Sequence, residues 1–136
     1  MSVGHWPAIL VAALAAWFIG ALWYSPVLFA KPWVKAHGFT PEQLTAMKAR
    51  APIAYGGSFF AFILIAFVLN LFLNHLGADS LRDGLGWGFH AWAGFALPLT
   101  FIATMYQNKS MASLLIDTGY QLIYLSAMGA ILGAWR

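Results

Sequence analysis

The chain has 136 residues, of which 62% are hydrophobic and only 8% are charged. Soluble domains carry about 25% charged residues, so this composition excludes an ordinary water-soluble core and indicates an integral membrane protein. The net charge of +3 comes from dispersed basic residues, which argues against nucleic-acid binding, and the lack of cysteine excludes disulfides and thiolate metal sites.

Four stretches nearly free of charge each exceed the roughly 20 apolar residues that a helix needs to cross a bilayer. They predict spans at about 6–29, 52–75, 85–106 and 111–135. Open sheet edges are excluded from lipid, and the stretches are too uniformly apolar for barrel strands. We therefore expect an all-α, polytopic four-helix bundle in a single membrane domain, 1–136. The first span lacks the basic start of a signal peptide, so we expect it to be retained.

The one sizeable polar segment, residues 31–51, separates the first two spans. Within it, Thr40, Pro41 and Gln43 have the spacing of a capping box with proline in the first helical turn. The pattern predicts a short cytoplasmic surface helix at about 41–50, ended by Pro52. In the third span, Pro98 is expected to kink the helix.

Basic residues are unequally divided between the two expected faces. The first and third loops hold Lys31, Lys35, Lys48, Arg50 and Lys109, and the opposite face holds Arg82 and Arg136. The positive-inside rule places those loops in the cytoplasm and both termini outside, as in a protein of the bacterial inner membrane. The bias favours this orientation over dual insertion.

Small residues recur at helical spacing in three spans, where they allow close approach of two backbones. The expected packing positions are Ala8, Ala12, Ala16, Gly20, Gly84, Gly88, Gly129 and Gly133. Packing within one bundle and association between copies both account for them.

Asp117 is the only acidic residue inside an expected span, where a charge is costly and often functional. Tyr120, Gln121 and Tyr124 continue a polar face along the same helix, and Tyr24 and Tyr55 are expected at a similar depth. Folding the last two spans about Asn108 would set Asp117 opposite Thr100 and Phe101. These residues form a candidate proton or cation site. The alternative is a helix cap or an interior acceptor for tyrosine and tryptophan donors, or a partner of Lys31 or Lys109.

A second candidate group lies toward the expected outer face. It comprises His5, His75, His90, Asn70 and Asn74. Histidines could hold a transition metal or haem. No helix contains paired spacing such as HxxxH, so interfacial histidines are the simpler interpretation, and neither a metal nor another cofactor is predicted. Bound lipid or detergent is plausible. Tryptophans near the expected interfaces, including Trp33, are interpreted as belt anchors.

Three sequence blocks resemble an uncharacterised family of small bacterial four-helix membrane proteins, known as a domain of unknown function. They are Trp23-Tyr24-Ser25-Pro26 followed by Phe29, Lys31 and Trp33; Asp117-Thr118-Gly119-Tyr120-Gln121-Leu122; and Gly129-Ala130-Ile131-Leu132-Gly133-Ala134-Trp135. The resemblance implies the fold and the membrane location but no reaction or ligand. The family pattern admits Asn at the position of Asp117, which implies that a proton relay there is not a family requirement.

The sequence leaves three hypotheses for function. The first is a non-enzymatic protein that self-associates or serves as a subunit of a larger membrane assembly, motivated by the glycine pairs. The second is a small oligomeric transporter or channel that uses Asp117 as a cation or proton site. The third is a redox, metal, lipid or quinone-binding membrane protein. No sequence feature supports a nucleic-acid partner.

Overall fold

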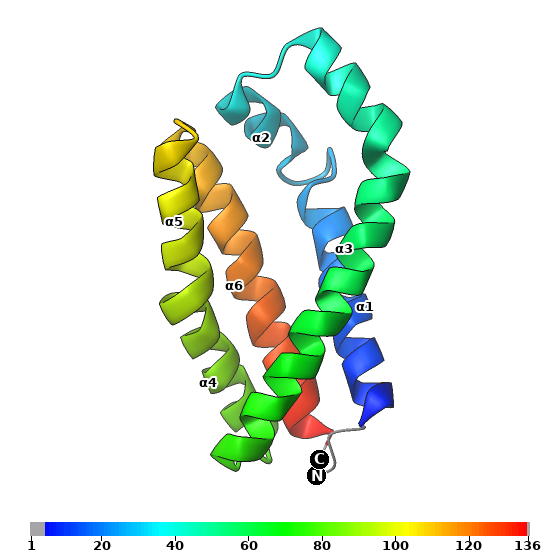
Figure 1. Cartoon of the computed structure of the whole chain (residues 1–136), viewed down its shortest axis with the longest axis vertical. Helices are drawn as coiled ribbons and strands as arrows, with labels where there is room; N and C mark the ends of the chain where they lie inside the picture. The colour runs from blue at the N-terminus through cyan, green and yellow to red at the C-terminus, as the bar shows by residue number, and fades with distance from the viewer. Residues whose placement is uncertain (1–4, 136) are drawn as a thin grey trace.

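The computed structural model describes residues 5–135, and every element in that range is helical (Figure 1). In chain order the elements are α1 (Trp6–Trp23), α2 (Ala30–His37), α3 (Pro41–Leu76), α4 (Leu81–Ala91), a π-helical turn η1 (Trp92–Ala96), α5 (Leu97–Tyr106) and α6 (Met111–Ala134). The all-α prediction is confirmed. Four helical segments are long and apolar enough to cross a membrane: α1, α3, the continuous stretch 81–106, and α6.

The first span is shorter than predicted, because α1 ends at Trp23 rather than near Phe29. A turn follows, in which Ser25 donates its hydroxyl to the carbonyl of Leu22 at 2.6 Å. Pro26 has no N–H with which to continue the helix. The chain then forms α2, which ends at Gly38 in the left-handed conformation (φ 66°) that glycine adopts without strain. The short helix between the first two spans is therefore at 30–37, not at 41–50.

The predicted capping box is present at the start of α3. The Thr40 hydroxyl accepts from the Gln43 backbone N–H at 3.2 Å, and the Gln43 side chain accepts from the Thr40 N–H at 2.8 Å. The prediction that Pro52 ends this helix is wrong, since α3 runs through it to Leu76. Proline removes one intrahelical hydrogen bond, at about 3 kcal/mol. A break at the start of an apolar segment would leave several backbone groups without partners, which is costlier in lipid.

A π-helical turn lies immediately before Pro98, where a kink was expected. Pro98 has no N–H, and its ring would clash with the carbonyl four residues earlier in a regular α-helix. One widened turn over Trp92–Ala96 relieves that clash, and the helix resumes as α5.

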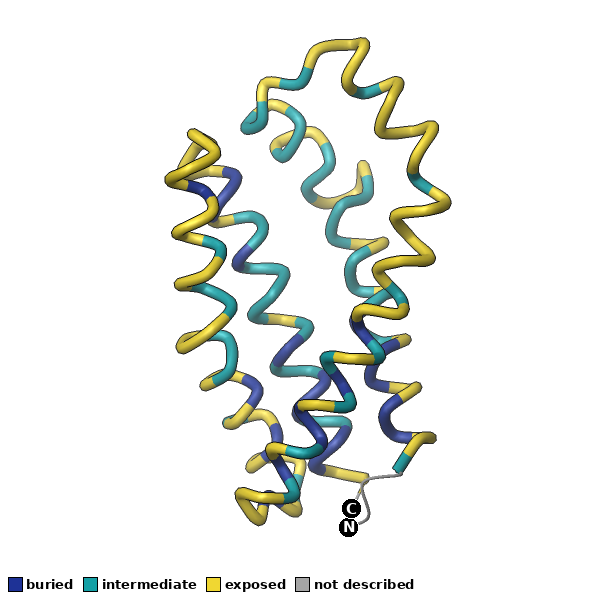
Figure 2. Tube along the Cα trace, in the orientation of Figure 1, coloured by how far each residue is buried: buried dark blue, intermediate teal, exposed yellow. Residues whose placement is uncertain are grey.

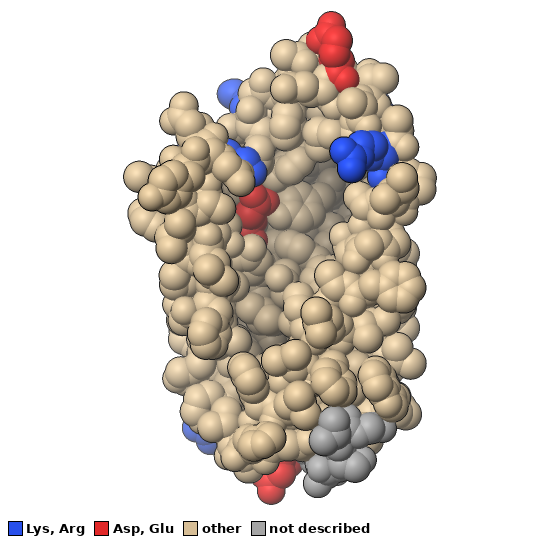
Figure 3. Space-filling model, viewed as in Figure 1, with Lys and Arg blue, Asp and Glu red and all other residues tan. Residues whose placement is uncertain are grey.

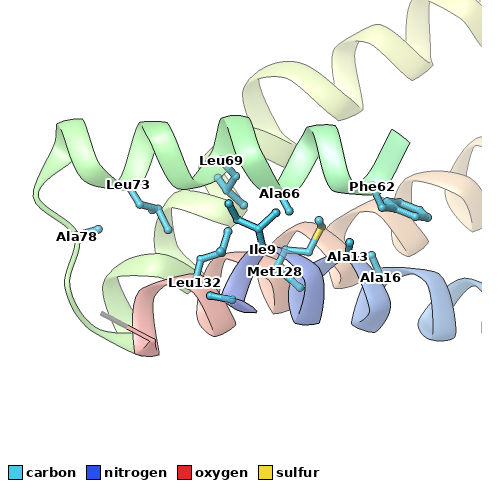
Figure 4. Packing of buried hydrophobic residues seen from close by; sticks show 12 residues of the cluster. Ile9, Ala13, Ala16, Phe62, Ala66, Leu69, Leu73, Ala78, Met128 and Leu132 are labelled. Atoms are coloured by element: carbon cyan, nitrogen blue, oxygen red, sulfur yellow. The ribbon is translucent and has the colours of Figure 1, made fainter. Parts of the chain in front are cut away.

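The core lies in the half of the bundle nearest the ends of the described chain, where α1, α3 and α6 meet (Figure 2). Figure 4 shows Leu73 of α3, Ile9 of α1 and Met128 of α6 pointing toward one another. The small side chains of α1 let its neighbours approach closely, and Ala12 and Ala16 are fully buried. Packing is therefore tight at one end of the molecule.

The other half of the bundle is more open. Nearly all residues of α3 before Phe62 are exposed, although they include large apolar side chains such as Ile53 (74% exposed) and Phe60 (72%). Trp17 of α1 donates its indole N–H to the Tyr55 carbonyl at 3.1 Å. The part of α3 that precedes Tyr55 diverges from the bundle (Figure 1). This divergence leaves room beside α6.

Candidate functional site: a carboxylate beside a membrane-level hollow

Asp117 accepts two hydrogen bonds through a single carboxylate oxygen. The Tyr24 hydroxyl donates to Oδ1 at 2.6 Å, and the Trp33 indole N–H donates to the same atom at 3.0 Å. Within residues 5–135, no hydrogen bond to Oδ2 and no ion pair to Asp117 is formed. One oxygen is thus held by the protein, while the other remains available in a half-buried side chain.

Further contacts fix the corner between α1 and α2 against α6. Trp23 donates its indole N–H to the Ile116 carbonyl at 3.0 Å, and the Ser110 hydroxyl donates to the Ala36 carbonyl at 2.9 Å. A side chain at Gly119 would lie 3.2 Å from the Trp23 ring, so glycine allows the indole to lie close to α6. The two sequence blocks around Trp23 and Asp117 therefore meet at one place.

Aromatic rings extend from this carboxylate toward the core. Tyr24 packs edge-on against Tyr120 with ring centroids 5.3 Å apart, and Tyr120 packs against Tyr124 at 4.7 Å. Tyr124 in turn contacts Phe62 of α3 at 5.0 Å. The Tyr120 hydroxyl donates to the Ala16 carbonyl at 3.0 Å, which satisfies that phenol. We call Tyr24, Trp33, Tyr120 and Tyr124 the aromatic cluster.

A hollow opens on this side of the molecule, between α3 and the pair formed by α5 and α6. Figure 3 shows acidic surface on its wall beside α6, where Asp117 is the only acidic residue, and basic surface at its rim, one patch of which adjoins the acidic surface. Asp117 is the seventh residue of α6, so it lies about 9 Å along the axis from the helix start. The carboxylate is therefore inside the expected membrane level but close to one interface.

Two residues expected near Asp117 lie elsewhere. The Tyr55 side chain is 61% exposed on α3, and only its backbone carbonyl makes a described contact, with Trp17. Gln121 faces α5, where its Nε2 lies 3.0 Å from the Thr100 hydroxyl. The expected register, with Asp117 opposite Thr100, is therefore displaced by one helical turn. Tyr24, Tyr120 and Tyr124 are brought together with or near Asp117.

The outer histidines do not form a common centre. His75 and His90 each place Nδ1 within hydrogen-bonding distance of a carbonyl one turn earlier in their own helix, at 2.8 and 2.7 Å. His5 packs edge-on against Trp135 with ring centroids 6.2 Å apart. Asn70 is fully buried within α3, and Asn74 lies one turn further along. Among the residues described, no three His, Asp or Glu side chains are grouped so that they could hold a metal ion.

The expected packing residues contact one another within the chain. A Cβ atom added to Gly84 would collide with the Gly129 carbonyl, and one added to Gly88 with the Leu125 carbonyl. Gly129 and Gly133 face Gly84 and Ser80 in the same way. In α1, Ala8, Ala12 and Ala16 are fully buried, and Gly20 lies against the Tyr120 hydroxyl. The two glycine pairs of α4 and α6 therefore interlock inside one bundle.

Trp33 was interpreted from sequence as a belt residue, yet it is one of the two donors to Asp117. Trp23, the neighbour of Tyr24, also anchors α6 through Ile116. Both belong to the sequence block that carries the family resemblance. That block was the one signal in the sequence that could have drawn them into the site.

The fold and this site define a small, polytopic helical membrane protein in which a carboxylate ties α2 to the last span. More specifically, the chain belongs to the DUF1761 family, whose model matches residues 7–133 and is described as a protein of unknown function. No match was found among curated proteins or among solved structures.

Proposed function

We propose that this chain is a non-enzymatic membrane protein that binds a small amphiphilic molecule in the hollow, with Asp117 as its polar anchor. The observation that supports the proposal is that the protein binds one oxygen of the Asp117 carboxylate and not the other. Tyr24 and Trp33 fix Oδ1 in place, while Oδ2 accepts no hydrogen bond from the described residues and the acidic surface is open in Figure 3. A polar group at membrane level that served packing alone would be expected to be saturated by the protein.

The shape of the site also supports a ligand. Binding sites for small molecules are concave and mostly apolar, with a few polar groups that fix orientation. Here the wall of the hollow carries one patch of acidic surface amid surface without Lys, Arg, Asp or Glu, and the rings of the aromatic cluster contact one another beside Asp117. We place the basic rim of the hollow at the cytoplasmic face of the inner membrane, because the first and third loops carry most of the basic residues. Amphiphiles of the inner leaflet would then reach it by lateral diffusion.

Native mass spectrometry of the full chain released from a mild uncharged detergent tests this proposal. We expect a reproducible small-molecule adduct on the wild type that is lost in Asp117→Ala. The matched control is Asp79→Ala, which removes an exposed carboxylate at the opposite end of the bundle and should retain the adduct. Wild type and Asp117→Ala without an adduct, or with the same adduct, would contradict the proposal.

Association with a second protein is a separate candidate, favoured by the exposed first half of α3. Because the glycine pairs of α4 and α6 are occupied within the chain, an interface is better sought on α3, where a side chain at Gly57 would meet open space. Gly57→Leu should then change the stoichiometry in mild detergent without lowering the stability of the monomer. A wild type that is monomeric in native membranes, established by crosslinking, would exclude this candidate.

A further inference from the structure

The charge of the expected ligand can be inferred from what surrounds Asp117, on the assumption that the hollow is a binding site as proposed above. The two groups that hold Oδ1 are a phenol and an indole, both uncharged donors. Within residues 5–135, no Lys, Arg or His forms an ion pair with this carboxylate. The protein therefore supplies hydrogen bonds to Asp117 but, among the described residues, no ion pair.

An ionised carboxylate at membrane level is costly unless a cation lies close to it. At short range and low effective dielectric, a pairing cation offsets several kcal/mol of that cost. Basic surface lies at the rim of the hollow (Figure 3), with one patch directly beside the acidic surface, at the level where lipid phosphates attract basic side chains. The position next to Asp117 inside the hollow is thus favourable for a positive group supplied by a ligand.

The aromatic cluster indicates which kind of cation suits this position. Tyr24 and Trp33 touch the carboxylate and pack against each other with ring centroids 5.6 Å apart, and Tyr120 lies 5.3 Å from Tyr24. Aromatic faces attract weakly hydrated organic cations, and aromatic cages are a common means of recognising alkylated ammonium groups. Small inorganic cations instead require several oxygen ligands, and the residues described offer a single carboxylate here.

We propose that the hollow selects amphiphilic organic cations, with the positive group beside Oδ2 of Asp117 and the aromatic cluster and with the apolar part in the uncharged hollow. The ammonium could belong to a free amphiphilic amine or to a lipid headgroup such as ethanolamine. Both sources present the same chemistry to the site. Binding is expected to depend on the charge of the ligand more than on its apolar surface.

Tetraphenylphosphonium and tetraphenylborate provide a direct test, because they have nearly the same size and shape and opposite charge. Equilibrium dialysis would measure their binding to the full chain in uncharged maltoside micelles, corrected for partition into empty micelles. We expect the cation to bind the wild type roughly tenfold or more tightly than the anion, and Asp117→Asn to lose that preference. Asn retains an oxygen acceptor for Tyr24 and Trp33, so it removes the charge with little change in shape. Asp79→Asn, which removes an exposed carboxylate, should leave the preference intact.

A second measurement avoids dependence on the folding of a variant. Dicyclohexylcarbodiimide reacts with carboxyl groups in apolar surroundings, and its adduct on Asp117 of the wild type can be quantified by peptide mass spectrometry. Tetraphenylphosphonium should slow this reaction several-fold, and tetraphenylborate should not. Equal effects of the two ions in both experiments, or no binding of either, would overturn the inference of cation selectivity. The broader proposal fails separately, if native mass spectrometry finds no adduct that depends on Asp117.

The source of the ammonium can be decided with the same probe. Short-chain phosphatidylethanolamine is added as a competitor, with short-chain phosphatidylglycerol as the matched control. Displacement of tetraphenylphosphonium by the ethanolamine lipid alone supports a lipid headgroup as the ligand. A lack of displacement by either lipid supports a free amphiphilic cation. Displacement by both lipids equally would contradict charge selection at this site.

Discussion

Replacing Gly88 with alanine should destabilise the bundle, even though alanine is the better helix former. A Cβ at Gly88 would lie 2.9 Å from the carbonyl carbon of Leu125 and 3.1 Å from the Cα of Ser126. The Leu125 carbonyl oxygen would be closer still, and all three are backbone atoms, so relief requires α4 and α6 to move apart by about one ångström to reach ordinary contact distances. Overpacking of this kind typically costs about 1–3 kcal/mol. A gap of that size also weakens the dispersion contacts along the interface.

Gly86 provides the matched control, because it lies in the same helix and a Cβ there would meet open space. Both substitutions gain up to about 1 kcal/mol in helix propensity, and this gain cancels in the comparison. Gly88→Ala should therefore be about 1–3 kcal/mol less stable than Gly86→Ala. In equilibrium terms this is roughly a 5-fold to 150-fold difference in the folded-to-unfolded ratio.

Unfolding by sodium dodecyl sulfate in maltoside micelles, followed by circular dichroism, would measure this difference. The titration should give the same result at several protein concentrations, because the glycine contacts are formed within one chain. Equal stability of the Gly88 and Gly86 variants would refute the interlocked packing of α4 and α6. A midpoint that rises with protein concentration for wild type but not for Gly88→Ala would instead assign these glycines to an interface between copies.

Three more outcomes are expected from individual hydrogen bonds. Tyr24→Phe removes a donor to Asp117 and should cost about 1.5–3 kcal/mol in the same titration, whereas Tyr106→Phe, at an 88% exposed side chain, should have no measurable effect. Thr40→Ala removes the helix cap and should speed amide hydrogen exchange in the first turn of α3 without changing global stability, corresponding to a local cost of about 0.5–2 kcal/mol. Pro52→Ala should slow exchange in the turn before residue 52, because α3 is already continuous there; unchanged exchange would contradict that continuity.

The helices could be predicted from the sequence because the bilayer permits few alternatives. Charge-free stretches of sufficient length must be helical in lipid, and the Thr40 capping box fixed the start of α3 within one residue. Local rules failed where tertiary or membrane context outweighs them. Pro52 ordinarily ends a helix, but the cost of exposed backbone groups keeps α3 intact. At Pro98, where a kink was expected, the helix contains the widened turn η1, whose exact form the sequence did not specify.

The candidate site was only partly predictable, because its members come from three separate segments. Asp117 could be identified from sequence alone, since a carboxylate within a span is rare. Trp33 could not, because a tryptophan near an interface has a simpler explanation as a belt anchor. The position of Trp33 depends on the turn after Trp23 and on α2. The sequence analysis predicted neither, because it extended the first span to about residue 29. Trp33, the second donor to Asp117, reaches α6 because it lies in α2.

The clamp at Asp117 and the hollow beside it lie at the same end of the bundle. The helix α2 packs against the first part of α6, held by Trp33 on Asp117 and by the Ser110 contact with Ala36. The first half of α3, which precedes the contact of Tyr55 with Trp17, diverges from the bundle (Figure 1) and leaves the hollow between α3 and α6. An Asn side chain could maintain this clamp through the same oxygen, so the architecture does not require a charge. A negative charge on Asp117 is therefore not needed for the clamp, and ligand selection in the hollow is the role that we propose for it.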